Sequence, residues 1–262
     1  MLKVVEAFSG IGAQKQALEK LNIEHEIINT IEWDINAIYA YDIMHHNDNS
    51  PSKLSKHEII ERLANVTLSP DGKKPFSDNG LYRIKEEKLQ KLYAAIRRNN
   101  NLCDITQVSG DMIPDDTDLL TYSFPCQDLS IGSVWYNKDN DGIRKGAKTR
   151  SGLLWEIERI LRERIMINVP LPKFLLMENV NAITSPKHNP NFVQWQEELE
   201  SMGYTNKVYK GLNALDFGVP QSRSRTFMLS IRNKDIEPEE ISNVNYNSQS
   251  NLGDYLRFNH KE

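Results

Sequence analysis

The sequence predicts an α/β fold built on a mostly parallel β-sheet with helices on both faces. Short apolar runs alternate with segments of helical periodicity from the first residues through His45, which is the rhythm of successive β-α-β units. The chain has 262 residues, enough to bury a sizeable core but few for two average domains. We therefore expect one large domain with at most a small appendage.

The first half of the chain supplies most of this rhythm. Strands are predicted at 3–8 and 26–31, and helices at 14–21 and 35–45. The rhythm breaks across 46–101, where polar residues surround two amphipathic segments, 53–64 and 85–98. We interpret 46–101 as an insertion at the rim of the sheet; partner docking and structural decoration are both open as its role.

The second half of the chain supplies the remaining strands and two helices. Apolar or strand-like runs occupy 119–123, 174–177, 204–212 and 226–231, and the last two are close enough to pair. Helical spacing relates Leu153, Leu154, Ile157, Ile160 and Leu161, and then Phe192, Trp195, Leu199 and Met202. After Lys234 the chain turns polar and acidic.

Composition limits the class of protein. The chain has 32 Lys and Arg against 36 Asp and Glu, a net charge of −4, so contact with nucleic acid must come from a local patch or a second subunit. Two cysteines, Cys103 and Cys126, cannot form a disulfide framework or a four-thiolate zinc site, and we predict no metal site. Without a signal-peptide core or a membrane-spanning run, we expect a soluble cytoplasmic protein without membrane contact.

Two motifs at strand ends could bind a nucleotide-like cofactor. Phe8-Ser9-Gly10-Ile11-Gly12 lies between a strand and a helix, where free amide groups can receive a carboxylate or phosphate. A plain strand-to-helix connection is the alternative, because the third glycine of the dinucleotide fingerprint is missing. Glu32, roughly twenty residues further on, could accept hydrogen bonds from ribose hydroxyls. Trp33 could stack on an adenine or simply pack in the protein.

Two further strand ends carry groups suited to covalent and acid–base chemistry. Phe124-Pro125-Cys126-Gln127 presents a thiol beside a rigid backbone, either as a nucleophile or as an inert buried cysteine. In Met177-Glu178-Asn179-Val180 an acid follows an apolar run. An apolar environment of Met and Val would favour the protonated form of Glu178, as a proton donor requires. Alternatively, Glu178 could be the neighbour of a helix N-cap or the partner in a salt bridge.

A row of donors leads into the last strand. Alternation places Gln221, Arg223 and Arg225 on one face, where they suit a phosphate, a carboxylate or a base carbonyl, or form a solvated face. Because an open α/β sheet binds ligands at the carboxyl ends of its strands, we expect these motifs to converge on one site. A nucleotide-like cofactor, a nucleophilic thiol, a proton donor and a row of basic side chains together suit a reaction in which the thiol attacks an electron-poor ring beside the bound cofactor.

In order and spacing, these motifs resemble the catalytic half of the cytosine-5 DNA methyltransferase family. The resemblance also includes Asp104-Ile105-Thr106 and the segment 212–220, and it covers residues 3–232. It implies a Rossmann-like S-adenosylmethionine-dependent methyltransferase fold, with a catalytic domain at 1–232 that contains the insertion, and a tail at 233–262.

The resemblance implies S-adenosylmethionine as the cofactor, bound across the glycine turn. Glu32 would hold the ribose, Trp33 would lie against the adenine, and Asp104 and Ile105 would lie at the adenine edge. The implied cofactor residues are Phe8, Ser9, Gly10, Ile11, Gly12, Glu32, Trp33, Asp104, Ile105 and Pro125.

The resemblance also implies a covalent mechanism on cytosine. Cys126 would add to carbon 6 while Glu178 protonates or hydrogen-bonds ring nitrogen 3, so that carbon 5 attacks the activated methyl group; loss of the carbon 5 proton then releases the thiol. Arg225 would contact the ring carbonyl or a phosphate, and Arg223 and Gln221 would hold the active-site loop. The implied substrate contacts are Gln127, Asn179, Val180 and Gln221.

Access to the ring requires that the target base leave the helix stack. The segment 129–150, rich in Gly, Asn, Lys and Arg, is expected to form a mobile loop that closes over the flipped base.

The resemblance stops before the family's variable target-recognition region. The tail contains Asn251-Leu252-Gly253-Asp254-Tyr255-Leu256, which resembles only the entry to that region. We therefore expect the catalytic subunit of a split bacterial or phage restriction–modification methyltransferase that acts on double-stranded DNA with a second protein subunit. A truncated chain or a decayed gene fits the same sequence. An uncovered sheet flank predicts self-association of the isolated chain.

Two alternative functions remain. The first is a tRNA cytosine-5 methyltransferase, although Ser123-Phe124 before Pro125 looks like the bacterial DNA-modifying pattern. The second is a non-catalytic S-adenosylmethionine-binding partner. The joint presence of Cys126 and Glu178 argues against it, because a binding module has no chemical need for a nucleophile and an acid together.

Overall fold

The computed structural model describes residues 1–46, 48–129, 142–147 and 149–232. In this part of the chain the six strands have the hydrogen-bonded order β2-β1-β3-β4-β6-β5. The strands are β1 (Leu2–Ala7), β2 (His25–Ile31), β3 (Leu119–Tyr122), β4 (Phe174–Val180), β5 (Thr205–Asn213) and β6 (Ser224–Ile231). The predicted strand positions are confirmed to within three residues at each end, with β4 the most extended beyond its apolar run.

The helices between these strands follow the predicted periodicity. They are α1 (Ala13–Lys20), α2 (Ile35–His46), α3 (Lys56–Arg62), α4 (Glu86–Arg98), α5 (Leu154–Met166) and α6 (Asn189–Ser201). Short 3-10 turns are η1 (Leu81–Arg83), η2 (Ile105–Gln107), η3 (Gly110–Met112), η5 (Ser151–Leu153), η6 (Asn181–Thr184) and η7 (Ala214–Phe217). None of the described helices is both long and apolar enough to cross a membrane.

The chain divides into two compact units. The first contains Met1–Phe124 and Leu153–Leu176, and the second contains Pro125–Gly152 and the described residues from Met177 onward. In the first unit β1 pairs in parallel with both β2 and β3, and the helices between these strands provide the long connections that parallel neighbours need. In the second unit β5 and β6 pair in antiparallel fashion, as their short separation in the sequence predicts. The predicted α/β class with a mostly parallel sheet is confirmed.

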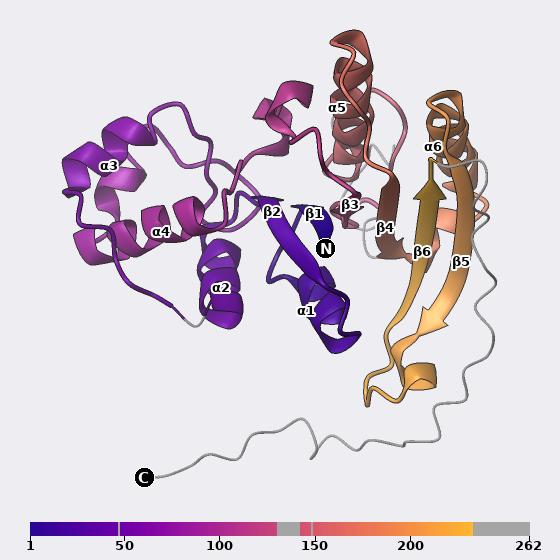
Figure 1. The fold of residues 1–262 in the computed structure, drawn as a ribbon, viewed down its shortest axis with the longest axis horizontal. Helices are drawn as coiled ribbons and strands as arrows, with labels where there is room; N and C mark the ends of the chain where they lie inside the picture. The colour runs from indigo at the N-terminus through magenta and orange to yellow at the C-terminus, as the bar shows by residue number, and fades with distance from the viewer. Residues whose placement is uncertain (47, 130–141, 148, 233–262) are drawn as a thin grey trace. The chain divides into compact units, whose positions relative to one another are not determined.

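The two amphipathic segments predicted within 46–101 form α3 and α4, which are grouped beside α2 in Figure 1. The buried face of α4 repeats at helical spacing through Leu89, Leu92 and Ile96. It packs on a cluster that includes Ile38 and Ile59. The start of α3 is fixed by a capping box between Ser55 and Glu58. This part of the first unit therefore has an apolar core of its own.

In the second unit, α6 buries Phe192, Trp195 and Leu199, the apolar set that the helical spacing predicts. A proline at the first turn suits the start of this helix, because its missing N–H would have no intrahelical partner there.

Candidate active site

The loop after β1 turns through three left-handed residues. Phe8, Gly10 and Gly12 have φ angles of 54°, 53° and 81°, and the left-handed conformation at Phe8 ends the strand one residue before the predicted end. A Cβ atom at Gly12 would lie 2.7 Å from the ring of Tyr41 and closer still to the ring of His45, so only glycine fits there. Nothing lies within 4 Å of a Cβ built at Gly10, so the main chain is uncovered at that point.

The carboxylate of Glu32 joins this loop to the end of β2. The backbone N–H of Gly10 donates to Oε2 at 3.0 Å, and the N–H of Asp34 donates to Oε1 at 2.8 Å. Burial raises the pKa of Glu32, and the two backbone donors oppose that rise because they stabilise the charged form. The neighbouring Trp33 is half-buried, and its carbonyl accepts the N–H of Ser69 at 2.8 Å. Glu32 is thus oriented before any ligand arrives.

Sequence reasoning did not identify Asn101, which holds Glu32 by its backbone. The amide of Asn101 donates to the carbonyl of Glu32 at 3.0 Å and accepts its N–H at 3.0 Å. The same Oδ1 accepts the N–H of Cys103 at 2.9 Å. No motif could have indicated this role, because the two residues meet only in the folded chain.

Asp104 and Ile105 follow directly along the chain. The Asp104 carboxylate caps η2 by accepting from the N–H of Thr106 at 3.0 Å and from its hydroxyl at 2.9 Å. The side chain of Ile105 is buried, and its carbonyl accepts a hydrogen bond from Arg159 at 3.0 Å. All the cofactor candidates of the first unit therefore lie at or just beyond the carboxyl ends of β1 and β2, or on the turn at η2.

In the second unit, Glu178 lies within β4 and forms an ion pair. Its Oε1 atom is 2.9 Å from Nε of Arg225 and 3.6 Å from Nη2 of Arg223. Both arginines reach one carboxylate because alternation along the chain places them on the same side. Glu178 therefore makes the salt bridge that was one of its alternatives, and its role as a proton donor stays a prediction.

The expected apolar wall of Met and Val around Glu178 is partly wrong. Burial alternates along β4, and Met177 and Asn179 are fully buried while Glu178 and Val180 are not. Because successive side chains of a strand point to opposite faces, Met177 cannot wall Glu178. The apolar run predicted a strand that stops at Met177, whereas β4 continues to Val180.

The end of β4 is tied to β6 by a residue that sequence reasoning missed. The Asn181 amide donates to Oγ of Ser224 at 2.8 Å and accepts the hydroxyl of Thr226 at 3.0 Å. Asn179 is buried, and its Oδ1 accepts the N–H of Val180 at 2.8 Å. These bonds hold the backbone on either side of the Glu178–Arg225 pair. The sequence offered one signal for this role, since Asn181 is a polar residue directly after the motif that contains Glu178.

The two cysteines differ in environment. Cys126 is half-buried in the turn after Phe124, where the N–H of Leu129 donates to its carbonyl at 3.0 Å. Cys103 is buried, and burial raises its pKa to about 12, so its thiol stays protonated at neutral pH. Cys126 is therefore the better nucleophile candidate.

Around Cys126, Pro125 is half-buried and Gln127 is exposed. The turn is anchored one residue further on, where Asp128 and Ser151 exchange hydrogen bonds at 3.0 and 3.3 Å. Gln221 is exposed before β6, and its N–H donates to the carbonyl of Val219 at 2.7 Å. Most of the expected mobile loop, residues 130–141 and 148, lies outside the described residues, as does the tail at 233–262.

Parallel strands with a glycine turn after the first strand and an acid after the second define the class of α/β proteins that bind nucleotide-like cofactors. Residues 81–262 match the model of the C-5 cytosine-specific DNA methylase family, and the chain belongs to this family. The resemblance stated from the sequence motifs is confirmed.

Two curated relatives agree with this assignment. The chain is 43% identical over 243 residues to the orphan methyltransferase M.SssI of Spiroplasma monobiae, covering 90% of this chain and 61% of that protein. It is 38% identical over 237 residues to the type II methyltransferase M2.ScrFI of Lactococcus lactis subsp. cremoris, covering 89% of this chain and 62% of the relative. The chain thus spans less than two thirds of the length of these relatives.

The fold is also similar to solved structures. The S. pombe Dnmt2 methyltransferase superimposes with a TM-score of 0.58 at 21% sequence identity, covering 98% of this chain and 61% of the other. A second neighbour is a putative DNA modification methyltransferase encoded within an E. coli prophage, with a TM-score of 0.51 at 17% identity, covering 88% of this chain and 47% of the other. At such identities the likeness shows the shared α/β fold alone.

Proposed function

We propose that this chain is the catalytic part of an enzyme that transfers a methyl group from S-adenosylmethionine to carbon 5 of cytosine in double-stranded DNA. The observation that carries the proposal is the ion pair of Glu178 with Arg225, 2.9 Å apart, in a member of the C-5 cytosine-specific DNA methylase family. An oriented acid on one strand and a guanidinium on another suit a planar ring with an acceptor nitrogen beside a carbonyl.

The residues after β1 and β2 fit S-adenosylmethionine. A ligand can approach the main chain at Gly10, because nothing lies within 4 Å of a Cβ built there. Each oxygen of Glu32 accepts one backbone N–H and has capacity for a ribose hydroxyl, since a carboxylate offers about four acceptor positions. When bound, the cofactor supplies an electrophilic methyl group.

The remaining cofactor contacts are proposed from the same loop and its neighbours. Amide groups of the glycine loop at the start of α1 would receive the cofactor's carboxylate. Trp33 would stack on the adenine, with Asp104 and Ile105 at its edge. The full proposed set is Phe8, Ser9, Gly10, Ile11, Gly12, Glu32, Trp33, Asp104, Ile105 and Pro125.

The proposed chemistry on the base belongs to the second unit. The thiolate of Cys126 adds to carbon 6 of cytosine, and the electron pair of the ring double bond shifts toward carbon 5 while Glu178 hydrogen-bonds or protonates nitrogen 3. Carbon 5 would then attack the methyl group of bound S-adenosylmethionine, and the electron pair of the broken C–S bond would leave with S-adenosylhomocysteine. A base removes the carbon 5 proton, and the electron pair of that C–H bond restores the double bond as the thiolate leaves.

Arg225 has two proposed tasks. Its Nε lies against Glu178, and its Nη1 donates to the carbonyl of Ser224 at 2.8 Å. A guanidinium has five N–H donors, so it can hold Glu178 and also donate to the ring carbonyl of the base. Arg223, half-exposed and 3.6 Å from the same carboxylate, would support that orientation. The proposed contacts along the flipped nucleotide are Gln127, Val180 and Gln221. Asn179, whose side chain is buried, would instead position the end of β4 through the N–H of Val180.

The experiment measures transfer of a radiolabelled methyl group from S-adenosylmethionine to mixed duplex DNA or to bulk tRNA. Cys126→Ala is the blank, and Cys103→Ala is the matched control because its thiol is buried. We expect label in duplex DNA that disappears with Cys126→Ala and persists with Cys103→Ala. Label confined to tRNA, or undiminished in the Cys126→Ala variant, contradicts the proposal.

The residues that read the DNA sequence are proposed to lie beyond the region shared with the relatives, on a second polypeptide. This proposal is supported by the net charge of −4, because the phosphate backbone requires positive charge from its partner. The same assay with and without the product of the neighbouring gene tests it. Transfer that needs the second polypeptide supports the split arrangement, and site-specific transfer by the chain alone contradicts it.

A further inference from the structure

Helix α2 faces the glycine loop through two rings. Tyr41 and His45, one turn apart on α2, have ring centroids 4.6 Å apart. They occupy the space beside Gly12 that a Cβ atom would need. The shape of the loop at Gly12 is therefore complementary to this pair of rings.

One of the rings also makes a hydrogen bond to the loop. Nε2 of His45 lies 2.9 Å from the carbonyl oxygen of Ile11. A carbonyl only accepts, so Nε2 carries the proton in this contact. Burial lowers the pKa of His45, so the ring is neutral at neutral pH and its donor nitrogen is assigned by this bond.

Glu6 links the other ring to the helix that follows the loop. This residue is fully buried in β1. Its Oε2 accepts the hydroxyl of Tyr41 at 2.6 Å, and its Oε1 accepts the backbone N–H of Lys15 at 2.9 Å. Gly12, at the N-cap of α1, provides no side-chain cap, so Glu6 satisfies an amide that the helix start leaves open. Glu6 thus connects β1, α1 and α2 around the loop.

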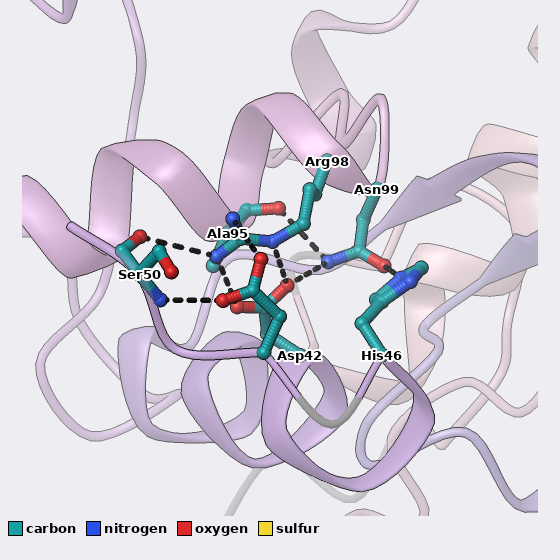
Figure 2. A network of polar contacts seen from close by, with 7 residues as sticks. Asp42, His46, Ser50, Ala95, Arg98 and Asn99 are labelled. Atoms are coloured by element: carbon teal, nitrogen blue, oxygen red, sulfur yellow. Dashed lines mark hydrogen bonds and ion pairs between the residues drawn. The ribbon is translucent and has the colours of Figure 1, made fainter. Parts of the chain in front are cut away.

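A neighbouring face of α2 makes polar contacts with the end of α4, as Figure 2 shows. Asp42 is buried and accepts from Nε and Nη2 of Arg98 at 3.0 and 2.8 Å. Nε2 of His46 lies 2.8 Å from Oδ1 of Asn99. Because Asp42 and His46 are also one turn apart, α2 is fixed by α4 on one side while Tyr41 and His45 face the loop.

We infer that Glu6, Tyr41 and His45 are positioning residues that hold the loop 8–12 in its ligand-binding conformation, acting through Ile11 and Gly12 without touching the methyl donor. The inference rests on the proposed function, in which this loop holds S-adenosylmethionine. Left-handed backbone at three of five residues is a conformation that a free loop rarely adopts, and holding it in advance removes an ordering penalty from binding. This arrangement also gives the segment 46–101 a role, since α4 holds α2 in place.

Three variants separate positioning from packing. His45→Leu removes the donor to Ile11, His45→Gln keeps an N–H donor, and Tyr41→Phe keeps the ring but removes the hydroxyl bond to Glu6. The matched control is Tyr39→Phe, on the same helix, whose hydroxyl donates to the carbonyl of Lys88 on α4. Two readouts are used with the full chain: hydrogen–deuterium exchange of amides 9–16 without ligand, and calorimetric titration with S-adenosylmethionine.

We expect His45→Leu and Tyr41→Phe to speed exchange in the loop and to weaken cofactor binding about 5- to 10-fold, the loss that one hydrogen bond represents. His45→Gln should keep the loop exchange rate and the cofactor affinity close to the wild-type values, and Tyr39→Phe should change neither quantity. Faster loop exchange with unchanged affinity would make the rings a purely structural contact and overturn the inference. Unchanged exchange and affinity in both variants would also overturn it while leaving the proposed function intact. A wild-type chain that binds no S-adenosylmethionine would contradict the proposed function first, and the inference with it.

Discussion

The carboxylate of Glu178 on β4 forms an ion pair with Arg225 on β6, with Oε1 2.9 Å from Nε, and both side chains are about four-fifths shielded from solvent. Shielding makes such a pair both stronger and more sensitive to the loss of one partner than an exposed pair. Asn181 fixes the strand backbones close by through Ser224 and Thr226. The orientation of the acid is therefore set by the protein before a base is present.

Removal of either partner should lower methyl transfer. Glu178→Gln should reduce kcat by about 10²- to 10⁴-fold, the range for loss of a positioned proton donor, and Arg225→Ala should reduce it less because the acid remains. Neither change should alter the affinity for S-adenosylmethionine. Single-turnover kinetics and cofactor titration check this, with Arg232→Ala as the control because that arginine is exposed just past β6. Equal kcat in wild type and Glu178→Gln would refute the assigned role.

The two thiols should react at very different rates. Cys126 is half-buried, whereas Cys103 is buried with its pKa raised to about 12, so little thiolate forms at Cys103. Iodoacetamide at neutral pH should therefore modify the native chain once, at Cys126, and modify Cys103 only after denaturation. Peptide mass spectrometry identifies the site. Rapid modification of Cys103 in the native Cys126→Ala variant would contradict the burial and the raised pKa of the Cys103 thiol.

Two glycines of one loop should respond differently to alanine. Gly12→Ala places a methyl group against Tyr41 and His45 at a φ of 81°, whereas Gly10→Ala meets open space at a φ of 53°. The free energy of unfolding should fall by about 2–5 kcal/mol for Gly12→Ala, from strain and overpacking together, and by about 1–2 kcal/mol for Gly10→Ala, from strain alone. Urea denaturation of both variants gives the comparison. Equal losses would mean that the rings do not fill the space beside Gly12.

Glu6 should make the stability depend on pH. Burial raises its pKa in the folded chain, although the Tyr41 hydroxyl and the Lys15 N–H partly oppose this. The folded state then binds the proton more tightly than the unfolded state, so the free energy of unfolding falls as the pH rises through the interval between the unfolded and folded pKa values. The glutamine of Glu6→Gln does not titrate. The free energy of unfolding of this variant, relative to that of wild type, should therefore increase as the pH rises from about 4, near the unfolded pKa of a glutamate, toward 7. Thermal unfolding of both chains across this range measures the difference. A constant difference would contradict the raised pKa.

Much of the fold could be predicted because local patterns are strong in this chain. Apolar runs placed β1, β2 and β3 to within a residue, and helical spacing placed α1, α2 and α4. The prediction was three residues short at the end of β4, which continues through Glu178 and Asn179 to Val180. Polar residues end an apolar run in sequence, but a strand can continue through them when another strand supplies partners such as Arg225.

The amino-acid sequence by itself determined the class of this protein: the β-α rhythm, the glycine turn, and the order of the cysteine, acid and arginine motifs that identify its family. Only the tertiary structure decided which groups meet. In the folded chain Arg225 forms an ion pair with Glu178, and Asn101 hydrogen-bonds the backbone of Glu32. The rings of Tyr41 and His45 on α2 pack beside Gly12. The physical reason is that motifs and periodicity are local properties of the chain, whereas hydrogen bonds and close packing between residues far apart in sequence depend on how the strands and helices come together.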